Sequence, residues 1–273
     1  MRPPWRRLTE HLADLAAETR RANDAVAALT QRLDALTYRV AEIDFELAAR
    51  PYTADGVGLE RTDADGSQYL GFEAGSAGSY ATFEDVFRGS EEFIRERLQP
   101  YVSLLADHAP VLDVGCGRGE LLSLLAGAGV TATGVDLDDS MLERAQAAGL
   151  DVVRADALEH LQSLPAGSLG GVVSVQVVEH LPVTELRALM SESLRVLRPG
   201  GVFIAETVNP HSPAALKVFW LDLTHVRPLF PESLLLLAEE TGFSRGRILF
   251  PFGDGDLGRD MRIRGEYALV AYR

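Results

Sequence analysis

The first fifty residues repeat apolar or small side chains in alternating steps of four and three, without a break from Leu8 to Leu47. A seam kept for more than five heptads predicts a coiled-coil helix over residues 1–50. Leu-rich d positions and β-branched a positions favour a parallel dimer, although Thr19 and Ala22 weaken the middle of the seam. We therefore expect a homo-oligomer, with a helix packed on its own domain as the alternative.

Pro51 ends this pattern, because proline cannot continue a helix ladder. Residues 51–82 are rich in Gly, Asp, Ser and Ala and keep no period, so we interpret them as a linker that is ordered only in part. A second amphipathic stretch predicts a helix from Glu84 to Leu105. This helix begins a domain that we place at residues 83–273.

From Val111 onward, short apolar segments alternate with amphipathic ones. We expect strands at 110–114, 131–136, 151–154, 170–176, 201–207, 246–251 and 266–272, and helices at 118–127, 139–148, 157–163, 184–197 and 231–241. Such alternation predicts an α/β fold with a mostly parallel sheet covered by helices on both faces. The last apolar segment follows a long loop, which favours an edge strand.

The charge is uneven along the chain, and it limits the partners. The net charge is −14; residues 1–50 hold 8 Arg and 8 acidic residues, so the remainder holds 18 basic and 32 acidic ones. That remainder would repel a phosphate backbone, so we expect no nucleic-acid partner. No apolar run predicts a membrane span or a signal peptide, and we expect a cytoplasmic protein. The single cysteine excludes an internal disulfide.

The segment from Val111 to Gly119 carries the strongest chemical signal. An apolar strand ends in Asp113, and a loop with Gly115 and Gly117 then opens a helix. Glycines allow the loop backbone to approach a ligand closely. The pattern D-x-G-x-G-x-G differs from the dinucleotide fingerprint, and its leading acid suits a cofactor with a cationic amino group, such as S-adenosylmethionine.

Two further acidic residues follow the next strands. Asp136 lies 23 residues after Asp113, about the spacing at which an acid after the second strand accepts hydrogen bonds from ribose hydroxyls. Helix capping is the alternative, although Asp138 is better placed for it. Asp156 is expected to accept a hydrogen bond from the adenine amino group, with the backbone amide of Ala157 beside it. Leu137, directly after Asp136, completes the expected cofactor site.

At these residues the chain resembles class I S-adenosylmethionine-dependent methyltransferases. VLDVGCGRG is similar to the first motif of that family, GVDLD to the second, RADAL to the adenine loop, and LRVLRPGGVFIAE to the helix and fifth strand. The resemblance covers about residues 110–273 and is specific in combination. It implies a Rossmann-like sheet of seven strands with the last strand antiparallel.

The fourth strand leads into Glu179 and His180, at the sheet edge where α/β proteins bind ligands. Capping of the next helix is the alternative role. Gln176, just before them, is expected either to touch the methionine part of the cofactor or to bind a metal. His225, in the later segment LDLTHVRPL, joins the candidates. His180 or His225 could act as general base, because neutral imidazole has a suitable pKa.

The same stretches resemble the methyltransferase domain of enzymes that terminate O-antigen polysaccharides. They resemble ubiquinone O-methyltransferases and small-RNA 3′-end 2′-O-methyltransferases more distantly. In several of these an E-x-x-E-H segment and a later His bind a divalent metal, which here implies Gln176, Glu179, His180 and His225 as ligands of Mg²⁺ or Mn²⁺, with Gln176 in place of the first Glu. The polysaccharide enzymes also have a lid helix, which implies that Arg88 pairs with the cofactor carboxylate; a solvent-exposed arginine on that helix is the alternative.

We therefore expect an O-methyltransferase that acts on a hydroxyl of a sugar, glycan or glycosylated molecule, with a metal-assisted and a metal-free mechanism both open. A methyltransferase for a small natural product is the first alternative. A coiled-coil scaffold that binds the cofactor without catalysis is the second, but it would require a damaged glycine loop, and the loop is intact.

Overall fold

The computed structural model describes residues 4–48, 60–62, 66, 68–70 and 91–273. The chain divides into two compact units, Met1–Ala49 and Arg50–Arg273. None of the helices in the described ranges is both long and apolar enough to cross a membrane.

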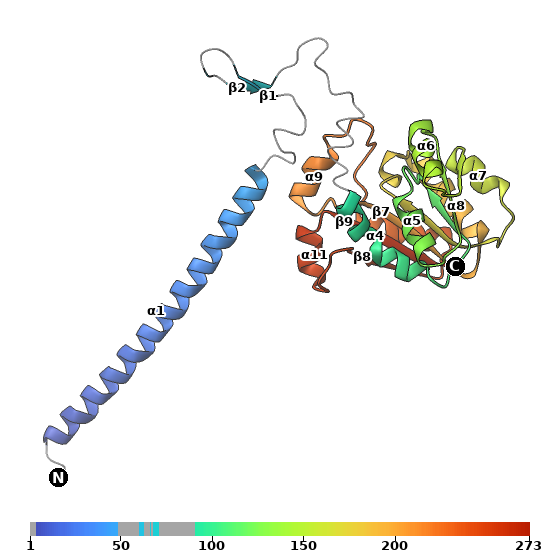
Figure 1. Ribbon diagram of the computed structural model, residues 1–273. Coiled ribbons are helices and arrows are strands. Elements are labelled where there is room, and N and C mark those ends of the chain that lie inside the picture. The colour runs from blue at the N-terminus through green and yellow to red at the C-terminus, as the bar shows by residue number, and fades with distance from the viewer. Residues whose placement is uncertain (1–3, 49–59, 63–65, 67, 71–90) are drawn as a thin grey trace. The chain divides into compact units, whose positions relative to one another are not determined.

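The first unit is one helix, α1 (Pro4–Ala48), which runs for 45 residues (Figure 1). The predicted N-terminal helix is therefore present. Its threonine hydroxyls donate to carbonyls one turn earlier, as in the 2.8 Å bond from Thr19 to Leu15. The apolar seam is exposed along the described side chains, and the pairing of α1 with another helix stays a prediction.

Part of the expected linker has regular structure that the sequence did not indicate. Strands β1 (Glu60–Thr62) and β2 (Gln68–Leu70) form a short antiparallel pair. Gly66, between them, has a φ of 87°, which favours glycine. The signal was weak because each strand has only three residues.

A seven-stranded sheet forms the centre of the second unit, as the sequence predicted. Its order is β5-β4-β3-β6-β7-β9-β8, and every strand except β9 points the same way. The strands are β3 (Val111–Val114), β4 (Ala132–Asp136), β5 (Val152–Arg154), β6 (Leu169–Val175), β7 (Leu197–Val208), β8 (Arg245–Leu249) and β9 (Glu266–Tyr272).

The expectation that the last strand lies at the edge is wrong. β9 pairs antiparallel with β7 on one side and β8 on the other. Its residues from Tyr267 to Ala271 are all buried, because a strand that is apolar on both faces is covered by helices on both. β8, with the polar sequence RGRIL, occupies the edge instead.

Helices cover both faces of the sheet (Figure 1). One face packs against α7, α8 and α10, and the other against α4 and α5, while α6 covers the β4 and β5 side. These helices are α4 (Glu91–Leu105), α5 (Glu120–Gly127), α6 (Asp139–Ala147), α7 (Ala157–Ser163), α8 (Val183–Val196) and α10 (Pro231–Thr241). The sequence did not predict η1 (Val178–His180), α9 (Pro213–Phe219) or α11 (Leu257–Ile263).

The strand alternation decides which helices face the cofactor loop. In β3, Leu112 and Val114 belong to the core on the α8 side, whereas Val111 belongs to the core on the α4 side. Asp113 is two residues from Val111 and therefore shares its face. The acid that ends β3 is thus directed toward α4 and α5.

Candidate active site

The loop after β3 is shaped by glycines. Gly115 has a φ of 71°, and a Cβ there would lie 2.3 Å from a methyl group of Val177. The amide of Gly117 donates to Oδ2 of Asp136 at 2.8 Å, and Oδ1 of the same carboxylate accepts from the Asp138 amide at 3.0 Å. Asp136 therefore fixes the loop to the end of β4. Substitution of Gly115 would displace the loop.

Four of the predicted cofactor residues line one cavity: Asp113, Gly115, Gly117 and Gln176. Burial raises the pKa of Asp113 to about 7, and the nearby Glu120 and Asp136 carboxylates add to the shift. An anionic cavity with a glycine-rich backbone suits a ligand that carries positive charge. Sequence reasoning therefore brought together residues that the fold places side by side.

Helix α4 supplies the opposite wall, with Ile94, Arg97 and Leu98. Arg97 was missed from the sequence, where Arg88 was expected to reach the cofactor; Arg88 lies outside the described residues. The available signal was a cation on the apolar side of the helix, among Ile94, Leu98 and Tyr101, which are all buried. A cation at such a position requires a buried partner.

That partner is Glu206 in β7, whose side chain is fully buried. Its Oε1 lies 3.3 Å from Nε of Arg97 and accepts a 3.1 Å bond from Nε2 of Gln176, and its Oε2 accepts from the Tyr101 hydroxyl. The backbone amide of Gln176 also donates to the backbone carbonyl of Glu206 at 3.0 Å. Gln176 has a φ of 56°, which is unfavourable for a residue with a Cβ, so these bonds hold it in place.

The remaining predicted cofactor residues lie at the neighbouring strand ends. Leu137 is 58% exposed beside the Asp136 carboxylate. Asp156 caps α7 by accepting from the amides of Leu158 and Glu159, so it has a structural role whether or not it meets adenine. Asp138, as expected, caps α6. The adenine contacts of Asp156 and Ala157 stay a prediction.

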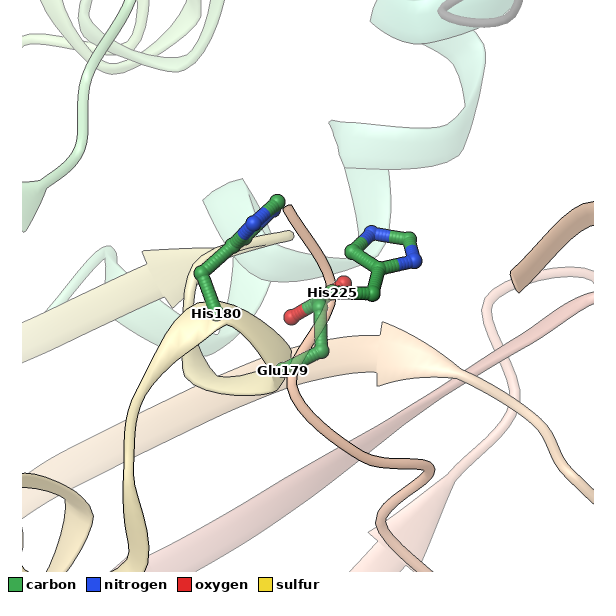
Figure 2. Close-up of side chains that lie close together, drawn as sticks. All are labelled: Glu179, His180 and His225. Atoms are coloured by element: carbon green, nitrogen blue, oxygen red, sulfur yellow. The ribbon is translucent and has the colours of Figure 1, made fainter. Parts of the chain in front are cut away.

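Glu179, His180 and His225 form a compact cluster just beyond β6 (Figure 2). One ligand atom from each lies within 4.8 Å of the others, and the two imidazole centroids are 4.6 Å apart. Figure 2 shows the Glu179 carboxylate between the two rings. The Val226 amide donates to the Glu179 carbonyl at 2.9 Å and joins the two segments that carry the cluster.

Neighbouring groups orient both imidazoles. Nδ1 of His225 lies 2.8 Å from the Phe219 carbonyl, which can only accept, and the ring stacks on that of Phe219 with centroids 4.5 Å apart. Nδ1 of His180 lies 2.9 Å from the Thr224 hydroxyl, which itself donates to Asp222 at 2.6 Å. These contacts favour the proton on Nδ1 of each neutral ring, which leaves Nε2 to bind a metal or take a proton, and Nε2 of His225 also lies 3.7 Å from Oδ2 of Asp222.

Glu179 is the unusual member of the cluster. Its carboxylate is fully buried, and neither oxygen has a hydrogen-bond partner of good geometry among the described residues. Burial raises the pKa of Glu179 to about 8. A buried carboxylate without a partner is costly, and a proton or a cation relieves that cost. Two imidazoles and one carboxylate form a donor set that fits a divalent metal of the transition series.

Gln176 belongs to the cofactor cavity, with its side-chain amide bonded to Glu206. Its role as a fourth metal ligand stays a prediction, as do the metal roles of the other three residues. The cluster of Glu179, His180 and His225 nevertheless lies close to the cofactor cavity along the chain, because Glu179 follows Gln176 by only three residues.

Known proteins resemble this chain in sequence and in fold. Residues 112–205 match the family described as "Methyltransferase domain". A crystal structure of an S-adenosylmethionine-dependent methyltransferase from Archaeoglobus fulgidus aligns over 72% of this chain and 100% of its own, with 31% identity and a TM-score of 0.65.

Curated relatives match over part of their length. A ubiquinone biosynthesis O-methyltransferase from Xanthomonas oryzae is 32% identical over 48% of this chain and 56% of its own. A probable S-adenosylmethionine-dependent methyltransferase from Mycolicibacterium smegmatis is 35% identical over 49% of this chain and 51% of its own. The chain thus spans about half the length of these relatives.

The sheet order, the glycine loop with its acidic residues and the likeness to the archaeal enzyme over its whole length define a class I methyltransferase. The chain belongs to the S-adenosylmethionine-dependent methyltransferases, and it is an enzyme of that class.

Proposed function

We propose that this enzyme transfers the methyl group to a hydroxyl oxygen, and that Glu179, His180 and His225 hold a divalent metal beside the acceptor. The observation that carries the proposal is the buried carboxylate of Glu179, which makes no hydrogen bond of good geometry among the described residues, although the Thr207 hydroxyl lies nearby, and which has a ligand atom within 4.8 Å of those of two oriented imidazoles. The name of the Xanthomonas relative, an O-methyltransferase, supports the choice of oxygen.

A hydroxyl is a poor nucleophile until its proton is removed, and a bound metal supplies the Lewis acidity that lowers the pKa of the hydroxyl. The chain's own residues supply the rest. Gln176 and Asp113 position the cationic cofactor, and α4 excludes water from its methionine end. Asp222 and Thr224 keep His180 oriented, while the Phe219 carbonyl keeps His225 oriented.

The acceptor is proposed to be a sugar or a sugar-bearing molecule. The segment around His225 also suits a second candidate, a small acceptor with an apolar or aromatic part. Trp220, Leu223 and Val226 are 61%, 86% and 48% exposed, an apolar surface on the same segment as the catalytic histidine. Ubiquinone-type methylation, the activity named for the Xanthomonas relative, is of this second kind. A comparison of a catechol with a methyl glycoside as acceptors separates the two candidates.

Metal dependence is the decisive test. We expect methyl transfer to stop with a chelator and to return with added metal. Mn²⁺ should restore at least as much activity as Mg²⁺, because Mg²⁺ prefers oxygen ligands whereas two of the three ligands here are imidazoles. His225→Ala is expected to raise the Mn²⁺ concentration needed for half-maximal activity at least about tenfold and to leave cofactor affinity nearly unchanged. Mn²⁺ binding measured by electron paramagnetic resonance checks the same loss without using activity.

The matched control is His160→Ala, which changes a histidine of α7 outside the cluster. If His225 is a general base without a metal, its alanine variant loses turnover at every metal concentration and chelation leaves the native enzyme active. Activity that survives both chelation and the substitution contradicts both mechanisms and leaves orientation of the reactants as the source of rate.

A further inference from the structure

The heptad seam of α1 can meet a second copy in either direction, so the side chains that face each other decide between the two arrangements. Seven apolar seam residues with described side chains, from Leu12 to Val40, are between 47% and 63% exposed. When two copies of the helix run in opposite directions and are centred between Ala27 and Ala28, every a position of one copy faces a d position of the other. The seam therefore matches itself when a second copy of the helix is laid against it in the reverse direction.

Reversed pairing distributes the small residues evenly. It places Thr19 opposite Leu36 and Ala22 opposite Leu33, with Leu15 opposite Val40 and Val26 opposite Leu29. Parallel pairing would instead place Thr19 against Thr19 and Ala22 against Ala22 in neighbouring layers and leave a void. Interfaces fill space best when large residues meet small ones. The Thr19 hydroxyl already bonds to its own helix, so it requires no polar group from the partner.

The flanking charges are compatible with the antiparallel direction. Glu18 and Arg39 are both g positions, and g positions face each other across an antiparallel pair. They lie at similar distances from the centre, on opposite sides of it, so Glu18 of each copy meets Arg39 of the other. In a parallel pair, Glu18 would instead meet the neutral Asn23, and Arg39 would meet Asp44, so each direction forms one kind of opposite-charge pair.

We propose that α1 associates with α1 of a second copy of this chain as an antiparallel coiled coil centred between Ala27 and Ala28, because the packing of Thr19 and Ala22 outweighs the preference for a parallel dimer that the residue types at a and d positions indicate. The C-terminal ends of the two helices then lie at opposite ends of a rod about 70 Å long, since α1 has 45 residues that each add about 1.5 Å. Each chain continues from the C-terminal end of its own helix toward its methyltransferase unit. The methyltransferase units of the two copies are therefore attached at opposite ends of the rod.

A charge exchange in the full-length protein tests the direction of pairing. We expect Glu18→Arg to raise the dimer dissociation constant about tenfold, because the introduced arginine would face Arg39 twice in each dimer. Adding Arg39→Glu in the same chain restores the affinity. Asp34→Arg, with the same change in charge at an outward b position, is the control and leaves the affinity within about twofold. A Glu18→Arg variant that associates as tightly as the native chain contradicts the proposal.

A distance measurement is independent of stability. A spin label at Asp14→Cys is expected to give an interchain distance of about 40 Å, whereas one at Ala28→Cys gives a distance below about 20 Å. Cys116 is buried and burial raises the pKa of its thiol, so the engineered cysteine reacts first. A short distance at both positions shows a parallel pair, and a monomeric mass shows that the copies do not associate; either result overturns the proposal.

Discussion

At the scale of single residues, Asp136 joins loop structure to ligand binding. Its carboxylate accepts hydrogen bonds from the backbone amides of Gly117 and Asp138. It also lies where the ribose hydroxyls of the cofactor are expected. We expect Asp136→Ala to weaken S-adenosylmethionine binding by roughly 2–3 kcal/mol, because two hydrogen bonds to a charged acceptor are lost. Isothermal calorimetry measures the change, and Asp139→Ala is the control, since that side chain is 70% exposed and pairs with Arg154. Unchanged affinity in Asp136→Ala would remove this residue from the site.

Asp113 makes a prediction about pH. Because its pKa is raised to about 7, it is mostly neutral at pH 6 and mostly anionic at pH 8. Cofactor affinity is expected to rise about tenfold across this range if the anion is the binding form, since the competent fraction rises about tenfold. The effect of pH on folding stability is opposite to its effect on cofactor affinity. The raised pKa of Asp113 stabilises the folded chain without cofactor below about pH 4, and this stabilisation is lost as the pH rises through 7.

Asp113→Asn is expected to bind the cofactor more weakly at pH 8 and to lose most of the slope between pH 6 and 8. Calorimetry at several pH values, with Asp107→Asn on the surface as control, measures both effects. A slope that persists in Asp113→Asn would assign the pH dependence to another group, such as the amino group of the cofactor.

At the scale of elements, Glu206 connects α4, β6 and β7 through Arg97, Tyr101 and Gln176. Glu206→Ala would leave a buried arginine without one of its two carboxylates, which costs about 3–5 kcal/mol of the free energy of unfolding. Glu206→Gln keeps an acceptor and is expected to cost less than half as much while still raising the KM for S-adenosylmethionine, because Gln176 loses its charged acceptor. Urea unfolding and steady-state kinetics check the two parts. Equal stability of both variants and the native chain would show that Glu206 does not hold these elements together.

The sequence predicted elements well where local signals agreed. The strands from β3 to β7 begin or end within a few residues of their expected bounds, because each is an apolar run between glycines or charged residues. It missed α9 and α11, although α7, which also has seven residues, was predicted. It also failed for the position of β9, because strand order depends on pairing between distant segments, which no local pattern encodes.

At the scale of the whole unit, the site combines four segments that are far apart in the chain. The glycine loop and the Glu179–His180 pair follow strands, so their convergence could be predicted from the rule that parallel strands end at one edge. Arg97 could not be placed in this way, since its position depends on how α4 packs beside β3. The orientation of His225 depends on Phe219 in α9, a helix that the sequence did not reveal.

The two-unit organisation gives the last prediction. Deleting residues 1–50 is expected to reduce the particle from two chains to one and to leave cofactor affinity within about twofold. The cavity lies wholly in Arg50–Arg273, whereas α1 carries an apolar seam that is 47–63% exposed, a surface that proteins normally cover by association. Light scattering over a range of concentrations measures the mass, and calorimetry measures the affinity. The variant with Leu29→Asp and Leu33→Asp, which keeps the full length but disrupts the seam, is the control and should have the same monomeric mass. A deletion variant that keeps the native particle mass would place the interface in the methyltransferase unit instead.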